Sequence, residues 1–161
     1  MPERATSLTG AAGEHYVAYV LSALGFPVGL TRGGSPTVDI LVSDVEGKKS
    51  ISIQVKTSNW AWRKYSKKVE HNHWEWDVGA KGKTLSGDSI FYAFVDLRWD
   101  ESKSLSENLE EEPVVFIVPS EDVEKELGDK NYSRYMFWIL ENDPHRYRNN
   151  WNTIIKDLQK K

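Results

Sequence analysis

The clearest pattern in the sequence joins residues 37–42 and 51–56 into a β-hairpin. With a two-residue turn at Glu46-Gly47, residues pair across the two strands when their numbers sum to 93. Strand side chains alternate between the two faces of a sheet, so this register places six apolar residues on one side. They are Val38, Ile40, Val42, Ile51, Ile53 and Val55. The hairpin therefore predicts one face that belongs to a hydrophobic core.

The other face of the same hairpin is polar. Asp39 lies opposite Gln54, and Thr37 lies opposite Lys56. An aspartate inside an apolar strand costs free energy if it is buried without a partner, and a divalent cation is one partner that would satisfy it. The alternative is a cross-strand ion pair between Asp39 and Lys56, worth about 0.2–1 kcal/mol. This polar cluster is where the function should be sought.

The remaining periodicity predicts an α/β domain that spans residues 1–161. Helices are expected at residues 7–24, 119–128 and 143–159, and further strands at residues 26–30, 90–97, 113–118 and 134–141. The last helix is placed at 143 because Asp143 is a good cap and Pro144 suits the first helical position. Residues 58–87 have no clean period and are interpreted as a Trp- and Lys-rich insertion.

Glu14 extends the apolar stripe of the first predicted helix toward its N-terminal end. Gly10 and Gly13 beside it would let that end of the helix approach a sheet closely. A carboxylate directed inward from this helix could reach a metal held by Asp39. The alternative is an acid that favours the N-terminal end of its helix, worth about 0.3–1 kcal/mol.

Composition narrows the chemistry. The chain has 161 residues, 39% apolar and 12% aromatic, and no apolar run near twenty residues, so a membrane span is excluded. No secretory signal pattern is visible, and a cytoplasmic location is expected. The absence of cysteine excludes disulfides, a thiolate nucleophile and cysteine-ligated zinc. A metal would need oxygen or imidazole ligands, which favours Mg²⁺ or Mn²⁺.

The net charge of −3 is distributed unevenly. Residues 59–84 contain six Lys or Arg against three acids, whereas residues 100–112 contain six acids against one lysine. Basic side chains interleaved with tryptophan suit single strands or distorted DNA, although the tryptophans could equally belong to a core or an oligomer interface. The acidic run 110–112 is expected to be a solvated turn. The candidate nucleic-acid-binding residues are Arg32, Trp60, Trp62, Arg63, Lys64, Lys67 and Lys68.

A motif emerges when these features are combined. Asp39 is followed fifteen residues later by Gln54-Val55-Lys56, after a helix that carries Glu14. This arrangement resembles the PD-(D/E)XK nuclease superfamily, and particularly small prokaryotic domains that read IQVKT, as residues 53–57 do here. The resemblance implies a restriction-endonuclease-like α/β fold, in which a mixed central sheet is flanked by helices in three layers. Its αβββαβ core would carry the insertion described above.

The resemblance also implies roles for the residues. Asp39 would be the principal metal ligand, Gln54 would stand where the second acid usually stands, Lys56 would be the catalytic lysine, and Glu14 would be the helix acid. The backbone carbonyl of Val55 is a further candidate ligand. The implied activity is Mg²⁺-dependent (or Mn²⁺-dependent) endonucleolytic hydrolysis of DNA phosphodiester bonds, and superfamily members that cut both strands often act as homodimers.

Gln54 departs from the usual motif because an amide replaces a carboxylate. This substitution favours an alternative, a catalytically degenerate nuclease-fold module that binds nucleic acid or a partner protein without cleaving. The acidic isoelectric point, about 5.8, is compatible with a third alternative, a scaffold without any role in nucleic-acid binding. His71 and His73 could also ligate a metal as neighbours on a loop.

Overall fold

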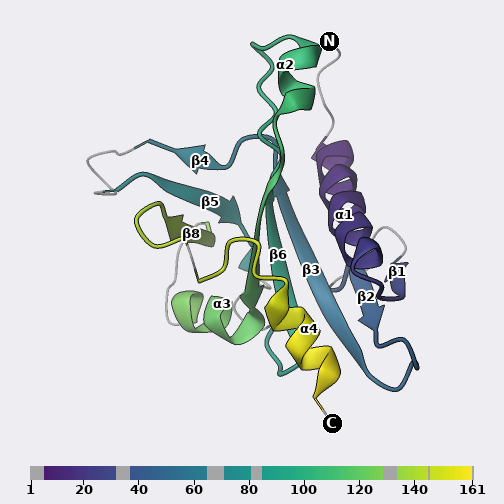
Figure 1. Ribbon diagram of the computed structural model, residues 1–161. Coiled ribbons are helices and arrows are strands. Elements are labelled where there is room, and N and C mark those ends of the chain that lie inside the picture. The colour runs from purple at the N-terminus through teal and green to yellow at the C-terminus, as the bar shows by residue number, and fades with distance from the viewer. Residues whose placement is uncertain are drawn as a thin grey trace.

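The computed structural model describes residues 6–31, 37–64, 71–80, 85–128, 134–144 and 146–160. Its centre is a mixed sheet of five strands in the order β1-β2-β3-β6-β7 (Figure 1). Only the β3–β6 pair is parallel, and the other pairs are antiparallel. The strands are β1 (Val28–Leu30), β2 (Ile40–Ser43), β3 (Ser50–Ser58), β6 (Ile90–Asp96) and β7 (Val114–Pro119). The predicted mixed α/β architecture is confirmed.

Two hydrophobic layers cover the central sheet. On one face, α1 (Thr6–Ala23) and α4 (Asn152–Gln159) pack against the apolar side of the hairpin and the odd-numbered residues of β6. On the other face, Tyr92 and Phe94 of β6 pack under α3 (Ser120–Leu127) and a second sheet. That sheet has the order β4 (Trp62–Arg63), β5 (His73–Asp77) and β8 (Met136–Leu140).

The register of the predicted hairpin is confirmed for residues 40–43 against 50–53, whereas the strand pairing does not extend to residues 37–39 and Val38 is only half-buried. Ile40 pairs with Ile53 and Val42 with Ile51, and all four side chains are almost completely buried. The turn is longer than the predicted two residues, because the pairing ends where the Asp44 amide donates to the Lys49 carbonyl at 2.9 Å. Gly47 has a φ of +69°, a left-handed conformation that favours glycine.

The Trp- and Lys-rich segment 58–87 contains two strands that periodicity missed. β4 and β5 pair with each other, and β5 also pairs with β8, which lies about sixty residues later. Trp74 and Trp76 are 4% and 3% exposed and belong to the second core. For these two tryptophans the core interpretation is therefore correct.

A short helix, α2 (Leu105–Glu110), also escaped prediction although the sequence carries its signal. Ser104 accepts a hydrogen bond from the Glu107 amide, and the Glu107 carboxylate accepts one from the Ser104 amide at 2.8 Å. This reciprocal capping box is a local sequence pattern for a helix start.

The C-terminal helix begins at Asn152, so the predicted start at Asp143 is wrong. The preceding residues pair instead with β7, the edge strand of the central sheet: the Ile117 amide donates to the Tyr147 carbonyl, and the Asn149 amide donates to the Val115 carbonyl. These bonds satisfy main-chain groups that an edge strand would otherwise leave unpaired. Among the described residues, no helix is both long and apolar enough to cross a membrane.

Candidate functional site

Asp39 is held at the mouth of the hairpin, one residue before β2. Its amide donates to the Ile53 carbonyl at 3.0 Å, which departs from the hairpin register by one residue, because Ile53 is the partner of Ile40. Its carboxylate oxygen Oδ2 accepts two hydrogen bonds, one from the Val55 amide at 2.7 Å and one from the Gln54 side-chain amide. The structure therefore brings Asp39 and Gln54 into direct contact, as the register predicts.

The surroundings of Asp39 act on its ionisation in opposite directions. Burial raises the pKa of the Asp39 carboxyl above its ordinary value, while the Val55 amide, the Lys56 ammonium and the Gln54 amide oppose that rise. Burial prevails, so the charged form of Asp39 is less stable here than in water. A cation beside it would remove that penalty.

Glu14 approaches the same place from α1, because the helix lies very close to β3. Gly13 faces Thr57, and a β-carbon added to Gly13 would lie 1.9 Å from the threonine Oγ1. The Thr9 hydroxyl also donates to the Asn59 side chain at 3.3 Å, which ties the start of α1 to the end of β3. The predicted close approach is confirmed at Gly13, whereas at Gly10 no atom lies close enough to require a glycine.

Glu14 and Asp39 are electrostatically coupled. Burial raises the pKa of Glu14, the negative charge of Asp39 raises it further, and His15 opposes the rise. Glu14, Asp39, Gln54 and Lys56 are hereafter called the Asp39 cluster. It joins residues of one helix and of both arms of the hairpin, and the charge of Asp39 opposes the ionisation of Glu14.

The donor atoms of the Asp39 cluster suit a hard divalent cation. The two carboxylates, the Gln54 amide oxygen and the Val55 carbonyl are all oxygen ligands of the kind that Mg²⁺ and Mn²⁺ prefer. No group of three or more Asp, Glu or His side chains is gathered in the described part of the chain. A cation at this place would therefore need the amide oxygen of Gln54, which a rotation of the amide group would present in place of the nitrogen.

We expect Glu14→Gln to stabilise the fold near neutral pH. A raised pKa means that the folded state binds the Glu14 proton more tightly than the unfolded chain does, so the ionised carboxylate opposes folding. This cost to the free energy of folding is absent below the ordinary pKa of 4.5 and reaches its full size above the raised pKa of the folded state. Thermal unfolding should show a higher midpoint for the variant at about pH 7.5, and the gain should vanish as the pH falls toward that ordinary value.

The matched control for this variant is Glu101→Gln, which removes an exposed acid from the turn after β6. Little change in stability is expected there, within about 0.5 kcal/mol. A gain from Glu14→Gln that does not depend on pH would contradict the electrostatic explanation.

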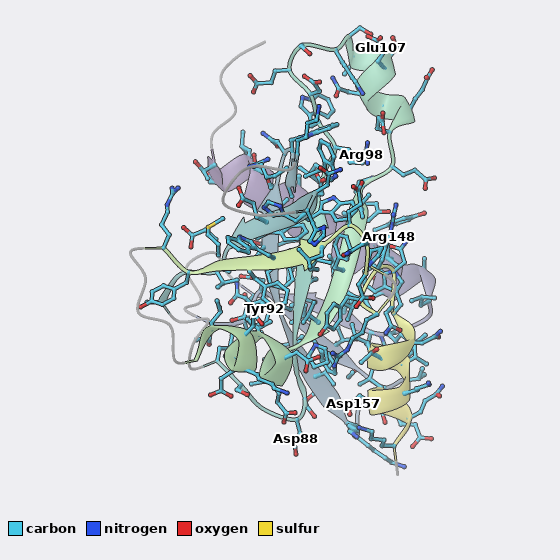
Figure 2. The ribbon with its side chains drawn as sticks, turned by 90° about the vertical axis from the view of Figure 1, so that its left-hand side faces the viewer. Asp88, Tyr92, Arg98, Glu107, Arg148 and Asp157 are labelled. Atoms are coloured by element: carbon cyan, nitrogen blue, oxygen red, sulfur yellow. The ribbon has the colours of Figure 1, made fainter. Side chains whose placement is uncertain are left out.

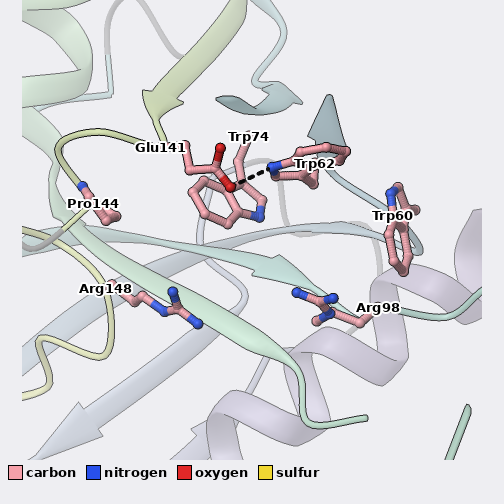
Figure 3. A pocket seen from close by; sticks show the side chains of 7 residues that line it. All are labelled: Trp60, Trp62, Trp74, Arg98, Glu141, Pro144 and Arg148. Carbon is pink, nitrogen blue, oxygen red and sulfur yellow. Dashed lines mark hydrogen bonds between the residues drawn. The ribbon is translucent and has the colours of Figure 1, made fainter. Parts of the chain in front are cut away.

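Of the other sequence-predicted residues, those that the structure describes do not join the Asp39 cluster. Trp60 and Trp62 line a separate pocket (Figure 3). Arg63 donates to the Glu75 carboxylate at 2.9 Å and to the Trp60 carbonyl at 2.6 Å, so its charge is already used within the protein. Lys64 follows β4 and is exposed. Arg32, Lys67 and Lys68 lie outside the described residues.

The two histidines that the sequence offers as metal ligands, His71 and His73, lie in different surroundings. His73 is 3% exposed, and its Nδ1 is 3.0 Å from the His71 carbonyl oxygen. Its Nε2 is 3.7 Å from the Glu75 carboxylate, whereas the His71 side chain is exposed. The geometry gives the His73 side chain a structural role in β5, the central strand of the second sheet.

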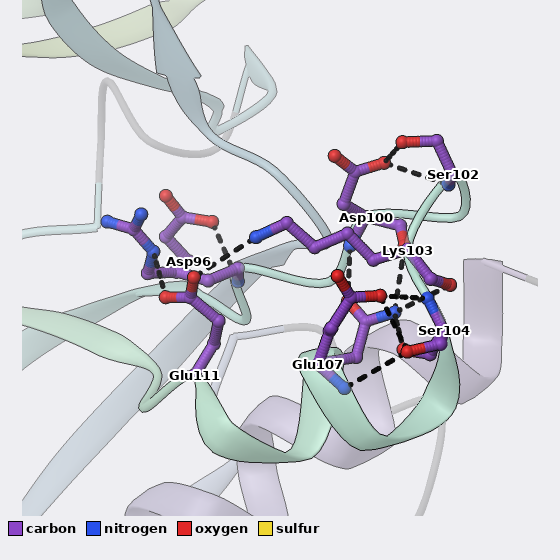
Figure 4. Close-up of polar contacts among 9 residues, drawn as sticks. Asp96, Asp100, Ser102, Lys103, Ser104, Glu107 and Glu111 are labelled. Atoms are coloured by element: carbon purple, nitrogen blue, oxygen red, sulfur yellow. Dashed lines mark hydrogen bonds and ion pairs between the residues drawn. The ribbon is translucent and has the colours of Figure 1, made fainter.

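The acidic run after α2 is partly neutralised rather than simply solvated. Glu111 forms ion pairs with Arg98 at 3.3 Å and with Lys103 at 3.1 Å (Figure 4). Each of these ties the loops that follow β6 to the start of β7. The prediction of a solvated turn is therefore wrong for Glu111, although Glu110 and Glu112 are exposed.

Comparison of the sequence with protein-family models and with curated proteins gives no match. The structure does have a solved counterpart, described as the structure of a bacterial homing endonuclease, I-Ssp6803I. The TM-score is 0.57 with 17% sequence identity, and the match covers 96% of this chain and 94% of the endonuclease chain. The likeness is one of fold. It extends over almost all of both chains, so the two proteins share one α/β fold.

Proposed function

We propose that the protein is a divalent-metal-dependent endonuclease that hydrolyses DNA phosphodiester bonds. The observation that carries the proposal is the meeting of Glu14 and Asp39, which come from α1 and the hairpin, next to the Lys56 ammonium. Two half-buried carboxylates with raised pKa values are costly for a fold unless a ligand uses them. The likeness in fold to an endonuclease agrees with such a use.

Each residue of the Asp39 cluster has a defined task in this proposal. Asp39, Glu14, the Gln54 amide oxygen and the Val55 carbonyl would hold Mg²⁺ or Mn²⁺. The bound cation supplies activation of the nucleophile and stabilisation of charge on the phosphoryl group. Lys56 donates a hydrogen bond to a phosphate oxygen and stabilises the negative charge that develops there. Cleavage of both strands would require two such sites, and thus a homodimer.

A second candidate function rests on the hydrogen bonds of Asp39. The Val55 amide and the Gln54 amide both donate to its Oδ2 atom, so this carboxylate oxygen is satisfied without any metal. Such an arrangement suits a degenerate nuclease module that binds nucleic acid or a partner protein but does not cleave. The two functions differ in whether the Asp39 cluster takes up a cation.

Titration with Mg²⁺ and with Mn²⁺, followed by calorimetry in the presence of DNA, separates the two functions. The endonuclease predicts saturable binding in the millimolar range or tighter, together with cation-dependent nicking of plasmid DNA. The absence of binding at millimolar cation would favour the degenerate module. DNA binding that persists with ethylenediaminetetraacetate but never leads to cleavage would favour it as well.

We expect Gln54→Glu to tighten cation binding by about tenfold or more. Two unit charges about 4 Å apart attract by roughly 4 kcal/mol at an effective dielectric constant near 20, so a third carboxylate adds more than the 1.4 kcal/mol that a tenfold change requires. Ser52→Glu is the matched control. Ser52 lies on the same face of β3 as Gln54, two residues earlier, and it pairs with Leu41. Equal effects of the two substitutions in calorimetry would contradict the placement of Gln54 in the metal site.

A further inference from the structure

A second candidate site lies apart from the Asp39 cluster, where the second sheet meets the ends of β6 and β7. It is a pocket of about 390 Å³, within the size range of small-ligand sites of about 300–1,000 Å³. Its walls come from β4 and the residues just before it, from β5, and from the segments that follow β6 and β8 (Figure 3). The lining residues are Trp60, Trp62, Trp74, Arg98, Glu141, Pro144 and Arg148. This group is hereafter called the tryptophan pocket.

The aromatic walls of the tryptophan pocket are fixed in place. The Trp62 indole nitrogen donates to the Glu141 carboxylate at 3.2 Å. The Trp60 ring lies beneath two cations, with the Arg98 guanidinium carbon at 5.2 Å and the Lys103 ammonium at 5.8 Å from the ring centre. Rings that are already held lose little conformational freedom when a flat ligand stacks on them.

The pocket also carries positive charge that the fold does not use up. Arg98 and Arg148 lie in the same part of the molecule (Figure 2). Arg98 and Lys103 share Glu111. The Asp96 carboxylate also acts on Arg98, so the charge of Arg98 is balanced within the fold. The Arg148 guanidinium carbon lies 6.0 Å from the centre of the Trp74 ring, and within the described residues no carboxylate pairs with it. Arg148 is exposed and available to an anion.

Trp74 contributes an unused hydrogen-bond donor. Its side chain is 4% exposed, and its indole nitrogen has no acceptor in the described part of the protein. Figure 3 shows this nitrogen turned toward the space between Trp62 and Arg98. A buried donor without an acceptor is unfavourable, and a ligand with an acceptor atom at this position would relieve it.

We propose that the tryptophan pocket binds one unstacked nucleotide of a DNA strand. The base lies against the rings of Trp60 and Trp62, an acceptor on its edge receives the Trp74 hydrogen bond, and the phosphate lies at Arg148. The inference rests on the proposed function for the choice of DNA as the carrier of this nucleotide. It adds a site that holds the strand at a distance from the scissile bond.

The chemistry of the pocket matches the two parts of a nucleotide. Stacking on aromatic rings holds a base of any sequence, and arginine binds the phosphate that always accompanies it. The Glu141 carboxylate repels a phosphate, so it directs the anion toward the arginine side and leaves its own side to the base. A base inside a duplex has both faces covered, so only an unpaired or extruded base can enter.

The test measures binding of a fluorescein-labelled oligothymidylate of about twelve nucleotides by anisotropy, in ethylenediaminetetraacetate. Trp60→Ala should weaken binding by about 5- to 140-fold, the loss typical of one stacked base. Arg148→Gln should weaken it less and should reduce the slope of log affinity against log salt by about one. Arg148 is exposed, so this second variant leaves the core intact.

Two matched controls lie outside the pocket on exposed side chains. Trp138 of β8 is 46% exposed, and the Arg134 side chain is 79% exposed. Trp138→Ala and Arg134→Gln should leave affinity within about twofold of the unaltered protein. A 2-aminopurine placed in the oligonucleotide gives a direct signal, because its fluorescence should change on binding to the unaltered protein and not to Trp60→Ala.

Several outcomes would decide the matter. Calorimetric binding of free thymidine monophosphate that is lost in Arg148→Gln, without oligonucleotide binding, would identify a free nucleotide rather than DNA as the source of the same chemistry. Equal losses in the pocket variants and the controls would overturn the proposal. The assay contains no divalent cation, so its result does not depend on whether the Asp39 cluster cleaves DNA, and a failure of the nuclease proposal would remain distinguishable from a failure of this one.

Discussion

Asp39→Asn is expected to reduce cation-dependent DNA cleavage by at least about 100-fold. Substitution of residues that merely orient a metal ligand already costs about 10- to 100-fold in affinity or activity, and Asp39 is proposed to be the principal ligand itself. Asparagine keeps an oxygen that can accept the hydrogen bond from the Val55 amide at 2.7 Å, so the hairpin should persist. Plasmid nicking at a fixed Mg²⁺ concentration measures the effect.

Asp44→Asn is the matched control for this substitution. Asp44 belongs to the same hairpin, but its carboxylate accepts the Lys48 amide at the turn, far from the Asp39 cluster. Its cleavage rate should stay close to that of the unaltered protein. Cleavage that survived both Asp39→Asn and Lys56→Ala would exclude the Asp39 cluster as the reactive site.

The Asp39 cluster was largely predictable because its contacts are local. The Asp39–Gln54 contact follows from alternation within one hairpin, where a register error of one residue would turn every apolar side chain outward. Glu14 needed one further step, the assumption that a glycine beside it allows a close helix–strand approach. That approach occurs at Gly13 and not at Gly10. Sequence alone does not say which of two glycines faces a neighbour.

The tryptophan pocket was not predictable, because its members meet only through long-range pairing. Trp62 and Trp74 are paired across β4 and β5, and Glu141 is brought to them by the pairing of β5 with β8. Arg148 reaches the pocket because its segment lies along the edge of β7 instead of entering the last helix. The aromatic and basic composition of segment 58–87 gave a partial signal for Trp60 and Trp62. It gave none for the arginines, which lie elsewhere in the chain.

The helix–strand contact at Gly13 links the fold to the proposed chemistry. β3 is flanked by β2 and β6, so it cannot retreat from α1 without disturbing the centre of the sheet. Thr57 fills the space that the missing side chain of Gly13 leaves, and its hydroxyl is buried without a hydrogen-bond partner among the described residues. The position of Glu14 beside Asp39 therefore depends on the absence of a single β-carbon one residue earlier.

Gly13→Ala is accordingly expected to destabilise the protein by about 1–3 kcal/mol or more, as overpacking of a core contact does. The new β-carbon would lie 1.9 Å from Thr57 Oγ1, 2.8 Å from its Cγ2 and 2.9 Å from its Cβ. Alanine is favoured over glycine inside a helix by about 1 kcal/mol, so helix propensity alone would make this substitution stabilising. A net loss of stability is therefore due to the clash with Thr57. Urea unfolding measures the free energy, and cleavage assays under native conditions should show a further loss if α1 moves Glu14 away from Asp39.

Gly10→Ala supplies the control within the same helix, because a β-carbon there meets no atom within 4 Å. It should stabilise the protein by up to about 1 kcal/mol. A double-mutant cycle with Thr57→Ala then tests the cause: removal of the threonine Oγ1 and Cγ2 should recover part of the stability lost in Gly13→Ala, so the two substitutions should not be additive. Additive losses, or equal effects of alanine at positions 10 and 13, would show that the contact with Thr57 does not set the distance between α1 and β3.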